Sequence, residues 1–227
     1  MLHDAQARGV TRLCHLTPHR NFVLIATEKG FQSSAALNAE ERQAFEQQDL
    51  ARYDGHPDHI CCSVEFPNAW YYRQKRPSAD SPFQTWVVVT INPAHLGRDG
   101  ALFCHRNAAS DWGAHIRGGL EGFEGMYASP VVGAGGRTYR RSATHLLSCP
   151  TDNQAEVLIP RSIPLTDVIT VALPTEERAR FVYAGLEALD AEPERFRFTI
   201  VPAFFNAYAL SNLISQGRRP EEREWLP

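Results

Sequence analysis

The alternation of apolar and polar residues near the N-terminus predicts a strand followed by a helix. Residues 10–16 alternate between the two kinds of side chain, which is typical of a strand with one buried face. Thr17 is placed to cap a following helix that has Pro18 at its first position and Gly30 at its end. A capping box predicts a second helix from residue 38 to about residue 53.

The pattern farther along the chain predicts mainly short strands. Runs rich in β-branched or aromatic residues, bounded by Pro, Asn, Asp or Gly, lie at residues 60–66, 85–91, 155–159, 168–172 and 196–201. Helices are expected over residues 111–120 and 175–189, turns in the glycine-rich residues 119–125, and a long loop over 128–149. Strands and helices interleave without a regular βαβ spacing, so the predicted fold class is α+β.

The composition is that of one globular domain. The chain has 227 residues, of which 43% are hydrophobic and 22% charged, enough apolar material for a core. We expect a single domain over residues 1–227, with the extension after about residue 205 unassigned. No apolar run approaches the ~20 residues of a membrane helix.

The number of cysteines and the net charge indicate the compartment and the kind of partner to expect. The five cysteines are an odd number with no CxxC pair, which supports neither a disulfide framework nor a zinc knuckle and favours a reducing compartment. We therefore expect a soluble, cytoplasmic protein. The net charge of -3 gives no overall positive field, so a nucleic-acid partner would need a local basic patch.

The first candidate for chemistry is the pair His15 and Thr17. Two residues apart on a strand, they point the same way, beside a helix start whose free N–H groups can bind an anion. The alternative is structural: His15 bonds to a neighbouring backbone group, and Thr17 only caps the helix.

Gln154 and Glu156 share one face of the predicted strand at 155–159. Val157 and Leu158 together suggest that the centre of this strand is buried on both faces. A carboxylate at the entrance of such a strand is costly unless it is paired, hydrogen-bonded or catalytic. The alternative is an edge position with Glu156 in water.

The sequence gives less support for a zinc site, a phosphate-binding loop or a serine hydrolase site. His56, His59 and Cys61 are zinc-ligand types, but no second cluster supplies a fourth ligand at a familiar spacing. The chain has neither the lysine-bearing phosphate loop of nucleotide-binding proteins nor the GxSxG of serine hydrolases. We therefore expect no metal.

Taken in order along the chain, four segments resemble the ADP-ribosyltransferase superfamily, and more narrowly the DarT type that modifies nucleic acid. They are residues 12–18 with Asn21, 59–72, 103–110 and 152–171. The resemblance implies two small facing β-sheets, surrounding helices, and NAD in the cleft between the sheets. It also implies an NAD-dependent mono-ADP-ribosyltransferase toxin that modifies a base in single-stranded DNA, with a macrodomain antitoxin as its partner.

The resemblance assigns four residues to NAD. His15 and Thr17 would bind the adenosine side, and Asn21 would help to fix the ribose or the phosphates. Tyr71, in an aromatic run, would lie against the nicotinamide, whose flat ring suits an aromatic face.

Glu156 corresponds to the catalytic glutamate. Breaking the bond between nicotinamide and ribose develops positive charge on the sugar, which a carboxylate stabilises. Arg52 is the best match to the arginine near the pyrophosphate and the reacting base, with Arg42 as a competitor. Gln154, on the face of Glu156, could orient the acceptor. No step requires a metal.

The acceptor site is predicted in the long loop. Arg137, Arg140 and Arg141 surround Tyr139, and such a mixture of charge and aromatic surface suits single-stranded nucleic acid. The alternative is a solvated loop that binds nothing, and residues 73–76 are then the next basic cluster. RNA or protein as the acceptor, and a binding module without transfer activity, remain open.

Overall fold

The computed structural model describes residues 1–227 except 29, 38–43, 45–51 and 76–84. Its helices are α1 (Leu2–Ala7), α2 (His19–Thr27), α4 (Ala69–Lys75), α5 (Gly119–Gly125), α6 (Glu176–Glu187) and α7 (Ala207–Ser215). Its strands are β1 (Leu13–Pro18), β2 (Phe31–Gln32), β3 (His59–Val64), β4 (Trp86–Ile91), β5 (Leu102–Cys104), β6 (Ile116–Gly118), β7 (Val131–Val132), β8 (Thr138–Tyr139), β9 (Glu156–Pro160), β10 (Ser162–Ile163), β11 (Val168–Leu173), β12 (Phe198–Ile200) and β13 (Arg223–Trp225). Short 3-10 helices are η1 (Pro93–Gly97), η2 (Ser110–Gly113), η3 (Ala134–Gly136), η4 (Leu165–Asp167), η5 (Pro193–Arg195) and η6 (Pro202–Phe205).

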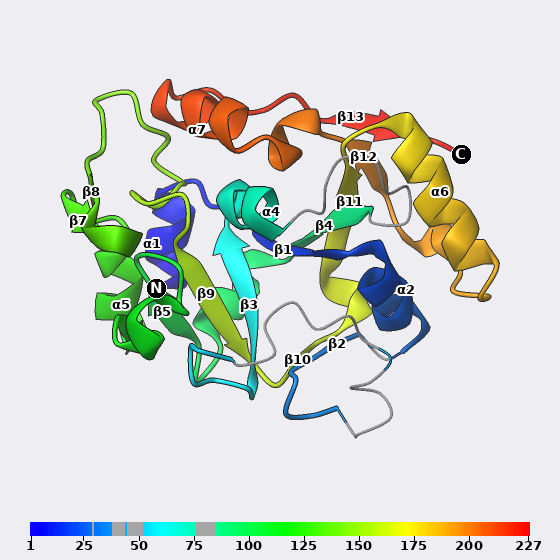
Figure 1. The fold of residues 1–227 in the computed structure, drawn as a ribbon, viewed down its shortest axis with the longest axis horizontal. Helices are drawn as coiled ribbons and strands as arrows, with labels where there is room; N and C mark the ends of the chain where they lie inside the picture. Colours follow the sequence, from blue (N-terminus) through cyan, green and yellow to red (C-terminus); the bar gives the residue numbers. More distant parts are fainter. Residues whose placement is uncertain (29, 38–43, 45–51, 76–84) are drawn as a thin grey trace.

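One large mixed sheet organises the described part of the chain (Figure 1). Its strand order is β13-β12-β11-β4-β1-β3-β9-β5-β6, and neighbours are antiparallel except for the parallel pair β11 and β12, which α6 connects. The predicted α+β class is confirmed. β1 and β3 are joined by two residue pairs, Leu13 with Val64 and Cys14 with Ser63. Beyond them β1 follows β4 and β3 follows β9, so the two predicted sheets are joined at one corner and diverge from it.

Helices cover both faces of the β1, β4, β11 and β12 part of the sheet (Figure 1). Alternate residues of β4 face opposite sides: Val87 and Val89 pack with Val182 of α6, whereas Val88 packs with Leu210 of α7. All six residues of β4 are buried, so hydrophobic contacts hold this strand from both sides.

The predicted strands at 60–66, 85–91, 155–159, 168–172 and 196–201 all exist with small shifts of their ends, as does helix 175–189 in the form of α6. Thr175 caps α6 by accepting a hydrogen bond from the Arg178 N–H. Residues 128–149 form mainly a loop, interrupted by the short hairpin of β7 and β8.

The predicted helix over 111–120 is wrong. Asp111 and Trp112 have positive φ angles of 52° and 57°, which stop a helix, and β6 follows them. The expected turns at 119–125 are also wrong, because these residues form α5. A Cβ on Gly122 would lie 2.6 Å from the Arg117 carbonyl oxygen, so glycine permits this close packing while Phe123 enters the core.

The predicted cap at Thr17 is wrong as well. β1 continues to Pro18, which pairs with Trp86, and Pro18 itself is the N-cap residue of α2 without a side-chain cap bond. Ladder pairing with β4 therefore keeps Thr17 in the strand. Most of the predicted helix at 38–53 lies outside the described residues. In the described part of the chain, no helix is long and apolar enough to cross a membrane.

Candidate active site

Three N–H groups converge on the carboxylate of Glu156, the first residue of β9. Oε2 accepts a hydrogen bond from the Ala108 backbone N–H at 2.8 Å. Oε1 lies 3.2 Å from Nδ2 of Asn107 and 3.4 Å from Nδ2 of Asn68, and both amides donate to it. The side chain is half-buried, so the alternative of an edge carboxylate in water is wrong. These donors stabilise the carboxylate and fix its orientation.

Local structure determines which way the Asn68 amide points. Its Oδ1 accepts a hydrogen bond of 2.9 Å from the Tyr71 N–H and thereby caps the start of α4. Its own backbone N–H donates to Oγ of Ser63 on β3, at 3.1 Å. The amide nitrogen is left to face Glu156, so this residue joins β3, α4 and the carboxylate.

The loop after β5 supplies the other two donors. Asn107 Oδ1 accepts from the Ala109 N–H at 3.1 Å, which turns its Nδ2 toward Glu156. Arg106 holds this loop through a bond of 2.8 Å from Nε to the Val132 carbonyl oxygen. Asn107 has no role among the predictions from the sequence, although it lies in one of the segments that carry the family resemblance.

His15 lies where β1 and β3 diverge. Its Nδ1 is 2.9 Å from the Cys61 carbonyl oxygen, and since a carbonyl only accepts, Nδ1 carries the proton. Burial lowers the pKa of His15, so the ring is neutral near pH 7 and its Nε2 is an acceptor. The expected backbone bond is present, and the ring orientation that it fixes leaves Nε2 for a ligand hydroxyl. Thr17 and Asn21 are both buried nearby, on β1 and α2.

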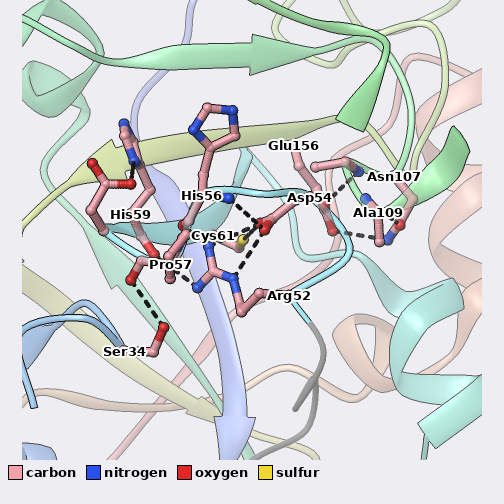
Figure 2. A network of polar contacts seen from close by, with 12 residues as sticks. Ser34, Arg52, Asp54, His56, Pro57, His59, Cys61, Asn107, Ala109 and Glu156 are labelled. Atoms are coloured by element: carbon pink, nitrogen blue, oxygen red, sulfur yellow. Dashed lines mark hydrogen bonds and ion pairs between the residues drawn. The ribbon is translucent and has the colours of Figure 1, made fainter. Parts of the chain in front are cut away.

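Arg52 anchors the loop that leads into β3 (Figure 2). Its Nε and Nη2 donate to the two carboxylate oxygens of Asp54 at 3.0 and 2.9 Å. Nη1 donates to the His59 carbonyl oxygen at 3.0 Å, and Nη2 also donates to that of His56. Burial acts to raise the pKa of Asp54, but the bonds from Arg52 and the His56 N–H lower it overall.

Arg52 also has an unusual backbone conformation. Its φ of 40° lies in the left-handed region, which is unfavourable for an arginine and persists only where the surroundings impose it. Figure 2 shows the network of Arg52 and Asp54 beside Glu156. Its predicted role near the pyrophosphate stays a prediction, and the competitor Arg42 lies outside the described residues.

Of the three residues of zinc-ligand type, His56 and His59 lie close together, and Cys61 does not join them. Cys61 turns its thiol to Oδ2 of Asp54, at 3.5 Å. In the described residues Asp58, rather than Cys61, joins His56 and His59 in a group with ligand atoms within 4.8 Å of one another. His59 uses both ring nitrogens, one at 2.8 Å from Asp58 and one at 3.0 Å from the Gly100 carbonyl oxygen. Hydrogen bonding thus accounts for this group.

The three loop arginines differ in their surroundings. Arg141 donates from Nη1 to the Cys149 carbonyl oxygen at 2.7 Å and from Nη2 to that of Leu146 at 2.8 Å, so its guanidinium ties the loop together. Arg137 and Arg140 are exposed, and neither side chain has a hydrogen bond or ion pair to the described part of the chain.

Gln154 is two residues before Glu156, and Tyr71 is on α4. Gln154 is half-buried just before β9, where its N–H bonds to Asp152. The Tyr71 ring is 6.4 Å from that of Trp86, and Nζ of Lys75 lies 5.8 Å from its centre. Their roles toward acceptor and nicotinamide stay predictions.

Known proteins share this arrangement of strands and helices. A family model described as "DarT: ssDNA thymidine ADP-ribosyltransferase, DarT" matches residues 14–205. The chain is similar in fold to Thermus sp. 2.9 DarT in complex with NAD+, with a TM-score of 0.56 and 14% identity over 86% of this chain and 97% of that one. The same Thermus protein in complex with ADP-ribosylated ssDNA gives a TM-score of 0.55 and 14% identity over 87% and 97% of the two chains.

A third similar structure is Thermosipho africanus DarTG in complex with ADP-ribose. It gives a TM-score of 0.53 and 15% identity over 86% of this chain, which spans 51% of that longer one. A search of curated proteins gives no match.

Proposed function

The chain belongs to the DarT family of single-stranded DNA thymidine ADP-ribosyltransferases, and on this premise we propose that Glu156 carries the transfer of ADP-ribose from NAD+ to a thymidine base. The family and the enzyme class predicted from the sequence are confirmed by the match over residues 14–205. NAD as the co-substrate agrees with this activity and with the Thermus neighbour that was solved with NAD+.

The observation that carries the proposal is the fixed carboxylate at the start of β9. Ala108, Asn107 and Asn68 donate to it from two separate loops. A carboxylate held in this way needs no reorganisation when positive charge develops next to it, and such preorganised charge is the main source of electrostatic catalysis.

The proposed reaction is a substitution at C1′ of the ribose attached to nicotinamide. The bond from C1′ to the nicotinamide nitrogen breaks, nicotinamide leaves with the electron pair, and C1′ becomes positive. Glu156 stabilises this charge by accepting hydrogen bonds from the ribose hydroxyls. The thymine ring nitrogen that carries a proton then bonds to C1′, and its proton passes to the Glu156 carboxylate.

Residues on β1 and α2 are assigned to the dinucleotide. The Nε2 of His15 can accept a hydrogen bond from a ribose hydroxyl, because Nδ1 already donates to Cys61. Thr17, Asn21 and Tyr71 complete the proposed contacts to adenosine, phosphate or ribose, and nicotinamide. Arg52 holds the loop before β3 through its bonds to Asp54, and we assign it to the pyrophosphate side of the dinucleotide.

A macrodomain antitoxin is the proposed protein partner. The support is the family resemblance, together with the similarity to the DarTG protein, of which this chain spans 51%. We also assign the activity to the cytoplasm, since all five cysteines are free in the structure and a reducing compartment keeps them so.

The experiment is transfer of label from NAD+ to oligonucleotides. The full chain is incubated with NAD+ labelled in the ADP-ribose part and with single-stranded DNA that contains one thymidine. Matched strands have that thymidine replaced by deoxycytidine or are made of RNA. Label on the thymidine strand alone supports the proposal. Label on RNA or on protein would show that the acceptor is RNA or protein and not thymidine in DNA. No label on any acceptor would favour a binding module without transfer activity.

A further inference from the structure

An exposed group of aromatic and cationic side chains lies where α4 meets α7. It consists of Trp70, Arg73 and Tyr208, and we call it the aromatic platform. The rings of Trp70 and Tyr208 are 5.0 Å apart at an angle of 75°. The guanidinium carbon of Arg73 lies 4.8 Å from the centre of the Tyr208 ring and 5.6 Å from that of Trp70. Tyr208 is 60% exposed and Arg73 is also exposed, whereas Trp70 is half-buried and packs against the core, so the outer side of this group lies on the surface.

Hydrogen bonds tie the aromatic platform to the segment that carries Glu156. Oγ of Ser211 on α7 accepts from Nε1 of Trp70 at 3.0 Å and from Nδ2 of Asn153 at 2.9 Å. Tyr208 and Ser211 are three residues apart and share one face of α7. Asn153 precedes Glu156 by three residues, so one serine joins the platform to the strand entrance (Figure 1 shows α4 and α7 above the start of β9).

The second connection runs through α4. This helix starts directly after Asn68, which donates to Glu156; Trp70 is on its first turn and Arg73 on its last. The aromatic platform is therefore connected to the segments around the carboxylate by two routes, one through α4 and Asn68 and one through Ser211 and Asn153.

The chemistry of the aromatic platform fits a base and its phosphate. Arg73 is exposed and has no ion pair with a carboxylate in the described residues, so its charge is available to an anion. The chain as a whole has a net charge of -3, which makes local cations important for binding a polyanion. Exposed aromatic faces next to an arginine are the surface on which unpaired bases stack.

We propose that Trp70, Arg73 and Tyr208 bind a nucleotide that flanks the target thymidine in single-stranded DNA. The base stacks on the exposed ring of Tyr208, which Trp70 supports edge-on, and Arg73 contacts the phosphate. The inference rests on the proposed function for the identity of the strand. Tyr208 lies beyond residues 14–205, so the family match does not assign this contact.

The test combines protein variants with modified strands. Single-stranded DNA with one thymidine is prepared with an abasic site at each flanking position in turn, and binding to the full chain is measured by fluorescence anisotropy. One abasic position should weaken binding by about fivefold or more, and Tyr208→Ala should weaken binding of the intact strand by a similar factor. Together the two changes should weaken binding no more than either alone, because they remove the same stacking interaction.

Two variants serve as controls. Tyr208→Phe keeps the ring and should bind the intact strand as the native chain does. Phe181→Ala removes a 40% exposed aromatic side chain from α6, on the opposite face of the sheet, and should also leave binding unchanged. Thermal unfolding midpoints establish that each variant is folded.

Binding of the intact strand by Tyr208→Ala with an affinity within twofold of the native value would refute the aromatic platform. Abasic effects that multiply with the effect of Tyr208→Ala at every position would also refute it, because the two changes would then act independently. Transfer of label by the native chain is measured on the same strands. If label is transferred but the abasic and Tyr208→Ala effects are independent, the platform is refuted and the proposed function stands. If the two effects are not additive but no label is transferred, the proposed function is refuted and the platform stands.

Discussion

Removal of the Arg219 side chain should destabilise the turn that carries Asn68 to the active site. Glu65, at the end of β3, is fully buried and has a positive φ of 68°. Its carboxylate accepts hydrogen bonds from the N–H and the hydroxyl of Thr11, at 2.7 and 2.9 Å, and forms an ion pair with Arg219. Arg219→Ala removes the cation that is paired with this buried carboxylate, while Arg12 stays bonded to the Glu65 carbonyl oxygen.

The magnitude follows from the burial of the two partners. Breaking a fully buried ion pair costs roughly 3–5 kcal/mol, whereas an exposed pair contributes about 0–1 kcal/mol. The Glu65 side chain is 0% exposed and that of Arg219 is 44% exposed, so water can reach the remaining carboxylate in part. We expect a loss of about 2 kcal/mol in the free energy of unfolding, or about 4–8 °C in melting temperature for a chain of this size.

The assay is thermal unfolding followed by circular dichroism, with urea unfolding as a second measurement. Arg218→Ala is the matched control, because its exposed side chain makes no ion pair with the described part of the chain. A melting temperature for Arg219→Ala within 1 °C of the native value, or an equal drop for Arg218→Ala, would show that this ion pair does not stabilise the turn.

Three further predictions concern the site and its surroundings. Asn107→Ala removes one donor from the catalytic carboxylate and should lower the rate of label transfer by about tenfold at saturating NAD+; a rate within twofold of the native value would contradict the assigned geometry. Burial lowers the pKa of His15, so protons bind the unfolded chain more readily and stability is lost as pH falls below about 6.5. The drop in melting temperature between pH 7.5 and pH 5.5 should therefore be smaller in His15→Gln, and an equal drop would contradict this. Replacing Arg137 and Arg140 by alanine should lower the salt slope of strand binding by roughly 0.7 for each phosphate that is no longer neutralised, while an unchanged slope would exclude both residues.

Much of the fold could be predicted because local pattern and tertiary burial agree. β4 is apolar except for Thr90 and is buried along its whole length, and β9 is apolar and buried after Glu156. Thr175 is the N-cap residue of α6, and two acidic residues follow it in the first turn. The residues that predict this helix from the sequence are therefore the ones that stabilise its start.

Other elements depend on interactions that the sequence pattern does not contain. The glycines of residues 119–125 are typical of turns, yet these residues form α5, and the buried Phe123 packs this helix against the core. Strand pairing over Thr17 and Pro18 outweighed the helix-cap signal. Long-range packing decided these cases.

The sequence indicated the main candidate residues of the site but not the groups that hydrogen-bond to them. Glu156 and His15 stand out by their places on strands, and the family resemblance assigned their roles, which stay predictions. The donors Asn107 and Ala108 lie about fifty residues before Glu156, and only the pairing of β5 with β9 brings them to it. The sequence also cannot show that the Arg141 guanidinium binds the carbonyl groups of its own loop, and the predicted role of Arg141 toward the acceptor stays a prediction.

The Glu156 carboxylate is the group on which the proposed transfer of ADP-ribose to thymidine depends. The decisive measurement is single-turnover transfer of label from NAD+ to a one-thymidine strand by the native chain and by Glu156→Gln. This nearly isosteric change removes the charge and keeps the size of the side chain. We predict a loss of at least ~100-fold in the transfer rate with an unchanged melting profile. Transfer at close to the native rate by folded Glu156→Gln would contradict the catalytic role of this carboxylate.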